Sequence, residues 1–234
     1  MKSLWSVSLV TLLFCGCVSI KPSHLTPYNE VMSDAPNVTQ YKPPANSHLF
    51  KATLDIRKHH LTGLLIIKSM DTLIKTQALQ QVTTLAPSKT GSGGTPGRYR
   101  FVFMNEVGMT FFDLEVKADS FKVVSCFSSL NKKALMKILE TDFRMLTWTG
   151  SPESTRIYRQ EKTNNIIVSG NAGKYKTWRT YSPPGDTLYS ISAKSTIADP
   201  VIISFSKYTK GFPGNIIIEN PFIGMKLSLR KLTR

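Results

Sequence analysis

The sequence predicts a mainly β protein, a single curved antiparallel sheet forming an open (half) β-barrel of about 11 strands covered by one amphipathic helix. Two observations carry this prediction. From Leu49 onward, short runs rich in β-branched and aromatic residues alternate with clusters of Gly, Pro, Asn and Asp. One stretch, residues 131 to 147, contains no Gly or Pro and spaces its apolar residues with a helical period.

The first predicted strands form a hairpin and then a meander. The hairpin pairs residues 50 to 57 with residues 61 to 68 around a turn at Lys58, His59 and His60. A weaker strand follows at 73 to 82, and the Gly-rich residues 88 to 97 read as a loop. The meander consists of strands at 98 to 105, 109 to 118 and 121 to 127.

The predicted helix interrupts this β pattern. Ser129 or Asn131 supplies the N-cap, and Gly150 with Pro152 ends the helix. One face carries the residues that recur at helical spacing, namely Ala134, Leu135, Ile138, Leu139, Asp142, Met145 and Leu146. We therefore expect this face to cover one open face of the sheet.

Turn residues divide the remainder of the chain into short segments, which are again predicted as strands. The predicted strands are 155 to 160, 166 to 170, 174 to 181, 188 to 193, 201 to 208, 215 to 219 and 225 to 232. No repeat period is evident, and all-β chains of this length commonly form one domain. We expect residues 48 to 234 to be that domain.

The N-terminus resembles a bacterial lipoprotein signal peptide. Lys2 precedes an apolar stretch from Leu4 to Phe14, which is shorter than the roughly 20 residues that a spanning helix needs. Small Gly16 precedes Cys17, whereas bulky Phe14 precedes Cys15. The resemblance implies removal of residues 1 to 16 and fatty acylation of Cys17.

Acylation would attach the protein to a membrane without a spanning segment, because two or more acyl chains bind a bilayer stably. Residues 17 to 47 are rich in proline and polar residues, so we expect a tether. No acidic residue stands beside Cys17, which by similarity to lipoprotein sorting patterns favours the outer membrane of a Gram-negative cell, at its periplasmic face.

The chain carries 30 Lys and Arg against 15 Asp and Glu, a net charge of +15. Anionic headgroups attract such a chain, and a lipid-anchored location argues against nucleic acid as the partner. The alternative is a solvated basic surface without a partner.

Only Cys126 remains once Cys17 is acylated and Cys15 removed, so no intramolecular disulfide and no cysteine-rich metal site is predicted. We also predict no metal centre of other kinds, no cofactor and a monomer.

The lipobox, the tether, the curved sheet and the single helix together resemble the LolA/LolB group of periplasmic lipoprotein carriers and outer-membrane acceptors. Residues 61 to 68 and 98 to 115 are also similar to a group of uncharacterised Bacteroidota-type lipoproteins. The resemblance implies an open β-barrel and brings no catalytic motif. Its link to lipoprotein transfer is an analogy at the level of the fold.

An open barrel can hold acyl chains on its concave face, under a helix that acts as a lid. The predicted lining residues of a hydrophobic cavity are Leu64, Ile66, Phe101, Phe103, Phe111, Ile138, Phe205 and Leu227. The alternative is that the same residues fill an ordinary core.

Basic and aromatic residues interleave at residues 174 to 181. The predicted contacts with a membrane or anionic headgroups are Lys174, Lys176, Trp178 and Arg179. An outward-facing solubilising strand is the alternative for this segment.

Catalysis is weakly indicated. In a regular strand Asp113 and Glu115 point to the same face as Phe111 and lie roughly 7 Å apart, which suits acid and base groups at a glycosidic bond. The stronger interpretation is pairing with Arg98, Arg100 or Lys117 on neighbouring strands. Catalytic residues are therefore predicted to be absent, and the protein is not expected to be an enzyme.

We predict a membrane-anchored, periplasm-facing lipoprotein that binds a hydrophobic or lipid-like ligand, with a role as lipid or lipoprotein acceptor in outer-membrane biogenesis. Its predicted partners are the outer membrane, through the anchor, and a lipid, acyl chain or lipoprotein cargo. The alternative is a non-catalytic structural or interaction subunit of a cell-envelope assembly.

Overall fold

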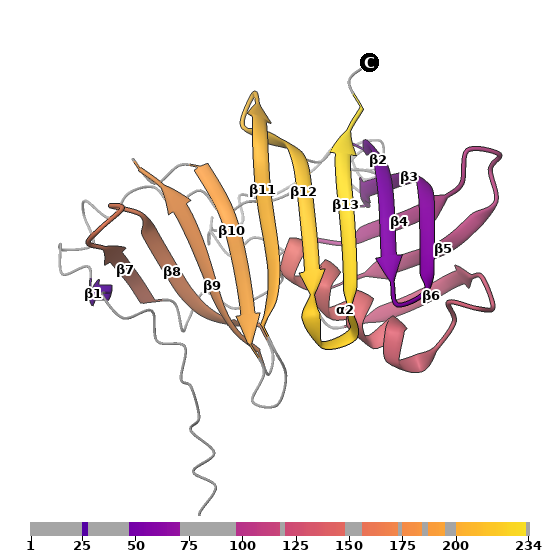
Figure 1. Cartoon of the computed structure of the whole chain (residues 1–234), viewed down its shortest axis with the longest axis horizontal. Coiled ribbons are helices and arrows are strands. Elements are labelled where there is room, and N and C mark those ends of the chain that lie inside the picture. The colour runs from indigo at the N-terminus through magenta and orange to yellow at the C-terminus, as the bar shows by residue number, and fades with distance from the viewer. Residues whose placement is uncertain are drawn as a thin grey trace, which may run out of the picture.

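The structure, a computed structural model, describes residues 25 to 27, 47 to 70, 97 to 117, 120 to 147, 156 to 172, 175 to 183, 187 to 194 and 200 to 232. Within these residues all strands belong to one antiparallel sheet (Figure 1). The strand order is β1-β7-β8-β9-β10-β11-β12-β13-β2-β3-β4-β5-β6, and the two end strands do not pair with each other. The predicted mainly β, open architecture is confirmed.

The sheet contains 13 strands, of which β1 has three residues. Their bounds are β1 Leu25–Pro27, β2 His48–Ile56, β3 His59–Ser69, β4 Tyr99–Met104, β5 Thr110–Val116, β6 Phe121–Cys126, β7 Arg156–Gln160, β8 Ile166–Ala172, β9 Tyr175–Ser182, β10 Thr187–Lys194, β11 Val201–Thr209, β12 Phe212–Asn220 and β13 Met225–Lys231. A short 3-10 helix, η2 Pro221–Ile223, joins β12 to β13. The weak strand predicted at 73 to 82 and the loop at 88 to 96 lie outside the described residues.

The helix α2, Lys133–Thr147, is the α-helix of the described residues and lies behind β12 and β13 in Figure 1. The helix packs on the sheet through aromatic side chains. The Phe143 ring stacks on the Phe101 ring, with ring centroids 4.1 Å apart and an interplanar angle of 7°. Phe112 approaches the same ring at 6.0 Å. The predicted helix that covers the sheet is therefore confirmed, with its start two residues later than expected.

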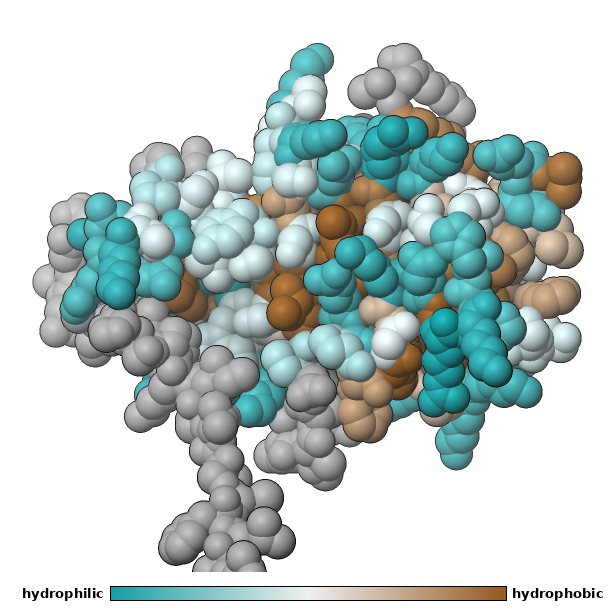
Figure 2. All heavy atoms as spheres, in the orientation of Figure 1, coloured by the Kyte–Doolittle hydropathy of each residue, from teal (hydrophilic) through white to brown (hydrophobic). Residues whose placement is uncertain are grey.

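The two faces of the sheet differ in chemistry. We call the face packed against α2 the inner face and the opposite one the outer face. On β12 the side chains alternate between them, so that Ile216 and Ile218 are fully buried inside while Ile217 is half buried outside. Figure 2 shows the outer face, where hydrophilic residues predominate and interrupt the hydrophobic ones.

Two turns differ from the prediction. His59 and His60 begin β3, and the turn consists of Arg57 and Lys58, with Arg57 at a φ of 52°. At the other hairpin, Lys210 and Gly211 form the turn with φ values of 52° and 73°, so β12 already starts at Phe212. Pro213 tolerates this position because it lies at the beginning of a strand.

A β-bulge between β4 and β5 places consecutive aromatic residues in the core. The register shifts at Phe103 and Met104, so that Phe103 pairs with Phe112 and Met104 with Thr110. Phe111 is the additional residue, and it packs against Phe103 at 4.9 Å. The expectation that Phe111 shares a face with Asp113 assumed regular alternation and is wrong, because the bulge turns Phe111 inward.

The segment predicted as a free tether is fastened at one point. Leu25, Thr26 and Pro27 form β1 and pair with Gln160, Arg159 and Tyr158 of β7. Figure 1 shows β1 beside β7 at the edge of the sheet that lies far from β6. The N-terminal segment thus adds a strand to the domain before the chain enters β2.

Candidate ligand-binding face

The inner face is a continuous apolar surface. Of the predicted lining residues, Phe101, Phe103, Phe111, Phe205 and Leu227 lie on it and are buried. Ile138 faces the same core from α2 and is half buried. Strands far apart in the sequence therefore contribute to one surface, which α2 covers.

The prediction that Leu64 and Ile66 line the inner face is wrong. Both are half buried on the outer face, whereas Leu65 and Ile67 between and beside them belong to the core. The register explains the exchange, because Leu65 pairs with Phe50 and Phe103, two inner residues. Leu64 to Ile67 form an unbroken apolar run, so the sequence shows no alternation from which the inner face could be read.

The helix rests against two flanks of the sheet. It approaches β5 on one side and β10 on the other, and these strands lie far apart in the strand order. The β5 side holds the stacked rings of Phe143 and Phe101. Toward the other half, Thr141 Oγ1 lies 3.4 Å from the Tyr175 hydroxyl at the start of β9. Between the flanks, side chains such as Phe50, Leu54 and Ile216 form a floor.

Asp142 is a buried carboxyl between this helix and the floor. Its side chain is fully buried, and neither carboxylate oxygen makes a hydrogen bond of ordinary geometry. Burial raises the pKa of Asp142 to about 8. Nearby Asn220, the last residue of β12, offsets this rise of the pKa only in part. Asp142 is therefore mainly protonated at neutral pH. The sequence placed Asp142 on the buried helix stripe but gave no signal that its neighbour there is Asn220 of β12.

Arg179 is a second correction, because it lies 3% exposed on the inner face and cannot contact headgroups directly. Regular alternation on β9 turns Arg179 inward and its neighbour Trp178 outward. Burial lowers the pKa of Arg179 to about 9, and Tyr181, two residues along the strand, acts in the opposite direction. Burial also raises the pKa of the Tyr181 phenol, which Arg179 partly offsets.

The other predicted headgroup contacts are placed differently. Lys176 is exposed and Trp178 half buried, both on the outer face, and Lys176 Nζ lies 5.4 Å from the Trp178 ring centroid. Lys174 lies outside the described residues. Contact of this strand with a membrane therefore stays a prediction, now confined to its outer face.

The carboxylates considered for catalysis are held in ion pairs. Arg100 donates to both oxygens of Asp113, at 2.8 Å from Nε and 2.6 Å from Nη2. Arg98 Nη2 donates to Glu115 at 2.9 Å. The Asp113 hydrogen bonds and charge raise the pKa of Arg100. This is the pairing expected from the neighbouring strands, and among the described residues no group of three or more His, Cys, Asp or Glu could hold a metal ion.

We expect Asp113→Asn to lower the free energy of unfolding by about 1 to 2 kcal/mol, because a two-pronged, half-buried ion pair is lost. Urea denaturation measures the change. Glu219→Gln is the matched control, since its pair with Lys226 at 2.9 Å is well exposed and should contribute less than about 0.5 kcal/mol. Equal losses in both variants would contradict the structural role given to Asp113.

Exposed apolar side chains gather around the β4–β5 hairpin and the edge strand β6. Val107 at the hairpin tip is 89% exposed, and Met109 and Phe127 are each 46% exposed. Phe127 follows β6 and donates its backbone N–H to the Phe111 carbonyl. These side chains lie at the opposite edge of the sheet from β1.

Comparisons with known proteins find no matching protein-family model and no curated protein of similar sequence. Two solved structures are similar in fold. One is described as a putative outer membrane lipoprotein-sorting protein domain from Vibrio parahaemolyticus, at 11% identity and a TM-score of 0.46, covering 82% of this chain and 86% of that one. The other is a LolA superfamily protein from Nitrosomonas europaea, at 11% identity and a TM-score of 0.43 with the same coverage.

At TM-scores below 0.5 this likeness is loose and supports no conclusion about function. Among its described residues, no helix has both the length and the apolar character required to cross a bilayer.

Proposed function

We propose that this protein is a membrane-anchored, periplasm-facing lipoprotein that binds a hydrophobic or lipid-like ligand between α2 and the inner face, as an acceptor of lipid or lipoprotein in the outer membrane. The observation that carries the proposal is a single amphipathic helix laid across the apolar inner face of an open sheet. An acyl chain offers that floor the same contacts as the helix does, so the two can exchange.

The contacts between α2 and the sheet are suited to such an exchange. The helix approaches β5 and β10, which flank the floor, so it bridges the floor between them. The buried carboxyl of Asp142 weakens the attachment of the helix to the floor, because its desolvation costs free energy that Asn220 offsets only in part. Displacement of the helix would uncover the apolar inner face that it covers.

The test is native mass spectrometry of the processed chain purified from its own host, followed by titration with a fluorescent fatty acid and a diacylated peptide. We expect a co-purifying acyl ligand at one per chain. Hydrogen exchange should then become faster in α2 and slower in β12 and β13 when ligand is bound. A chain that carries no lipid and takes up neither probe would overturn the proposal.

Phe143→Leu is expected to bind the fatty acid about fivefold more tightly. The variant keeps an apolar side chain and loses the stacking on Phe101, worth about 1 kcal/mol, which stabilises the closed position of α2. A fluorescence titration measures the affinity. Lys137→Ala is the control, because Lys137 is exposed on the same helix and, within the described part of the chain, its ion pair is with Glu140 at 2.8 Å.

An unchanged or weaker affinity in Phe143→Leu, with Lys137→Ala equal to the unmodified chain, would contradict competition between helix and ligand. Both variants should also unfold at similar urea concentrations, which excludes a difference in the amount of folded protein as the cause of such a result.

The second candidate function is a non-catalytic interaction subunit of an envelope assembly. The exposed apolar side chains of Val107, Met109 and Phe127 favour it, because an exposed apolar patch marks a contact surface. A photoreactive residue at position 107 should then crosslink in cells to one discrete protein, whereas the same residue at exposed Lys162 should not. In that case the chain should also fail to bind the fatty acid.

A further inference from the structure

We propose that β1 fastens the lipid-anchored N-terminal segment to the β7 edge of the sheet and thereby holds one outer-face patch against the anionic headgroups of the membrane. The patch consists of Arg156, Lys176, Trp178 and Lys194. The inference rests on the acyl anchor at Cys17 that the proposed function includes. It is independent of whether the inner face binds a ligand.

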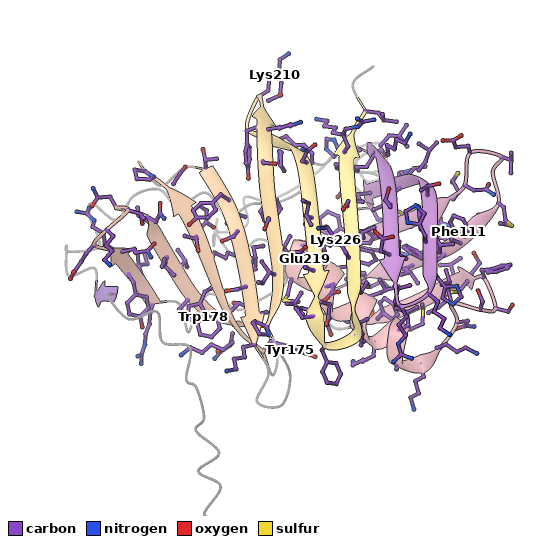
Figure 3. All side chains as sticks on the ribbon, viewed as in Figure 1. Phe111, Tyr175, Trp178, Lys210, Glu219 and Lys226 are labelled. Carbon is purple, nitrogen blue, oxygen red and sulfur yellow. The ribbon has the colours of Figure 1, made fainter. Side chains whose placement is uncertain are left out.

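The register of the sheet brings these four residues together. Ser169 of β8 pairs with Arg156 on one side and with Trp178 on the other, which places the two in one row across β7, β8 and β9. In the adjacent row Lys176 stands directly opposite Lys194 of β10. Figure 3 shows Trp178 in the lower part of β9, on the half of the sheet that carries β1.

The chemistry of the patch fits the headgroup region of a bilayer. Arg156 and Lys176 are exposed, and within the described residues neither forms an ion pair. Trp178 is half buried with Lys176 beside its ring at 5.4 Å, and an amphipathic ring next to cations is typical of the membrane interface.

The length of chain between the anchor and β1 decides which surface meets the membrane. Cys17 precedes Leu25 by eight residues, which span at most about 29 Å. Without β1 the free tether would run to residue 47 and span about 100 Å, and the domain could face the membrane in any orientation. From β1 to β9 the distance across the sheet is three strand spacings, about 15 Å. The patch therefore lies within reach of a bilayer that holds Cys17.

Quenching of Trp178 by brominated phospholipids tests this arrangement. Signal cleavage removes Trp5, and Trp148→Phe then leaves Trp178 as the remaining tryptophan of the three in the chain. We expect the lipidated chain to show strong quenching on vesicles of phosphatidylglycerol and phosphatidylcholine, less on phosphatidylcholine alone, and less at high salt.

The double variant Arg156→Gln with Lys176→Gln should lower the equilibrium constant for contact between the patch and the membrane about 25-fold. Each charge lost accounts for about fivefold. The matched control is Lys51→Gln with Arg230→Gln, which removes the same charge from the outer face near the middle of the sheet. It should leave the quenching within about twofold of the unmodified chain.

Two insertions test the role of β1. Twelve Gly and Ser residues placed between Lys21 and Pro22 lengthen the stretch between anchor and β1, and should weaken the quenching. The same insertion between Gln40 and Tyr41, after β1, should leave the quenching unchanged. Equal effects of both insertions would overturn the fastening by β1.

Flotation of the vesicles separates this inference from the proposed function. A chain that floats with the vesicles but shows no quenching of Trp178 overturns the orientation and leaves the anchor intact. A chain that does not float overturns the anchor, and the orientation with it. Ligand binding on the inner face is measured independently by mass spectrometry.

Discussion

Replacing Asp142 with asparagine is expected to stabilise the protein above pH 8 and to remove a loss of stability that the unmodified chain shows as the pH rises. In the unfolded chain the Asp142 carboxyl titrates near pH 4, whereas in the folded chain burial raises its pKa to about 8. Between these values the folded state keeps a proton that the unfolded state has released.

The sign follows from proton binding. Stability falls with rising pH wherever the folded state binds more protons, so the contribution of Asp142 is fully present below about pH 4 and is lost progressively up to about pH 8. A shift of this size corresponds to a change on the order of 5 kcal/mol over the interval, as an upper bound. Asparagine has a similar shape and does not titrate, so Asp142→Asn should equal the unmodified chain at acidic pH and exceed it at alkaline pH.

Urea denaturation at a series of pH values from 5 to 9 measures the effect, and Asp55→Asn is the control because Asp55 is exposed and pairs with exposed His60. Parallel pH profiles for the unmodified chain and Asp142→Asn would show that Asp142 is not the titrating group. Because Asp142 lies between α2 and the floor, the same experiment followed by hydrogen exchange should show α2 loosening first as the pH rises.

Replacing Gly63 with alanine is expected to lower the free energy of unfolding by about 3 kcal/mol or more. A Cβ at Gly63 would lie 2.0 Å from the carbonyl oxygen of Met104, and within 3.0 Å of the Met104 carbonyl carbon and the Asn105 Cα. All three are backbone atoms, so the end of β4 would have to move away from β3.

Gly108→Ala is the comparison that isolates the clash. At Gly108 the φ is +90° and nothing lies within 4 Å of an added Cβ, so only backbone strain of about 1 kcal/mol is expected. Thermal or urea denaturation of both variants gives the two losses. A loss at Gly63 no larger than that at Gly108 would contradict the close approach of β3 and β4.

Much of the fold is readable from local sequence. The strand runs, the turn residues and the helical period of residues 131 to 147 depend on neighbours in the chain, and the observed elements fall within a few residues of the predicted ones. The pairing of Asp113 and Glu115 with Arg100 and Arg98 was also foreseen, because cross-strand neighbours follow once the meander is recognised.

The candidate site was only partly readable. Phe205 and Leu227 alternate with polar residues, so their inner position follows from the period of a strand. The run from Leu64 to Ile67 has no alternation, and only its pairing with Phe50 and Phe103 decides which residues face inward. Arg179 was grouped with its outer-face neighbours by composition, although its strand position turns it to the opposite side.

Local sequence was enough to predict the class of the fold and the number and order of most elements, because each depends on residues close together in the chain. The acylation of Cys17 stays a prediction. Three features became visible only in the folded chain, namely the inward turn of Phe111 at a bulge, the burial of Asp142 on the sheet-facing side of α2 and the attachment of β1 to β7. These features depend on which distant segments share a register, and pairing across the sheet is set by the whole assembly of strands rather than by any one of them.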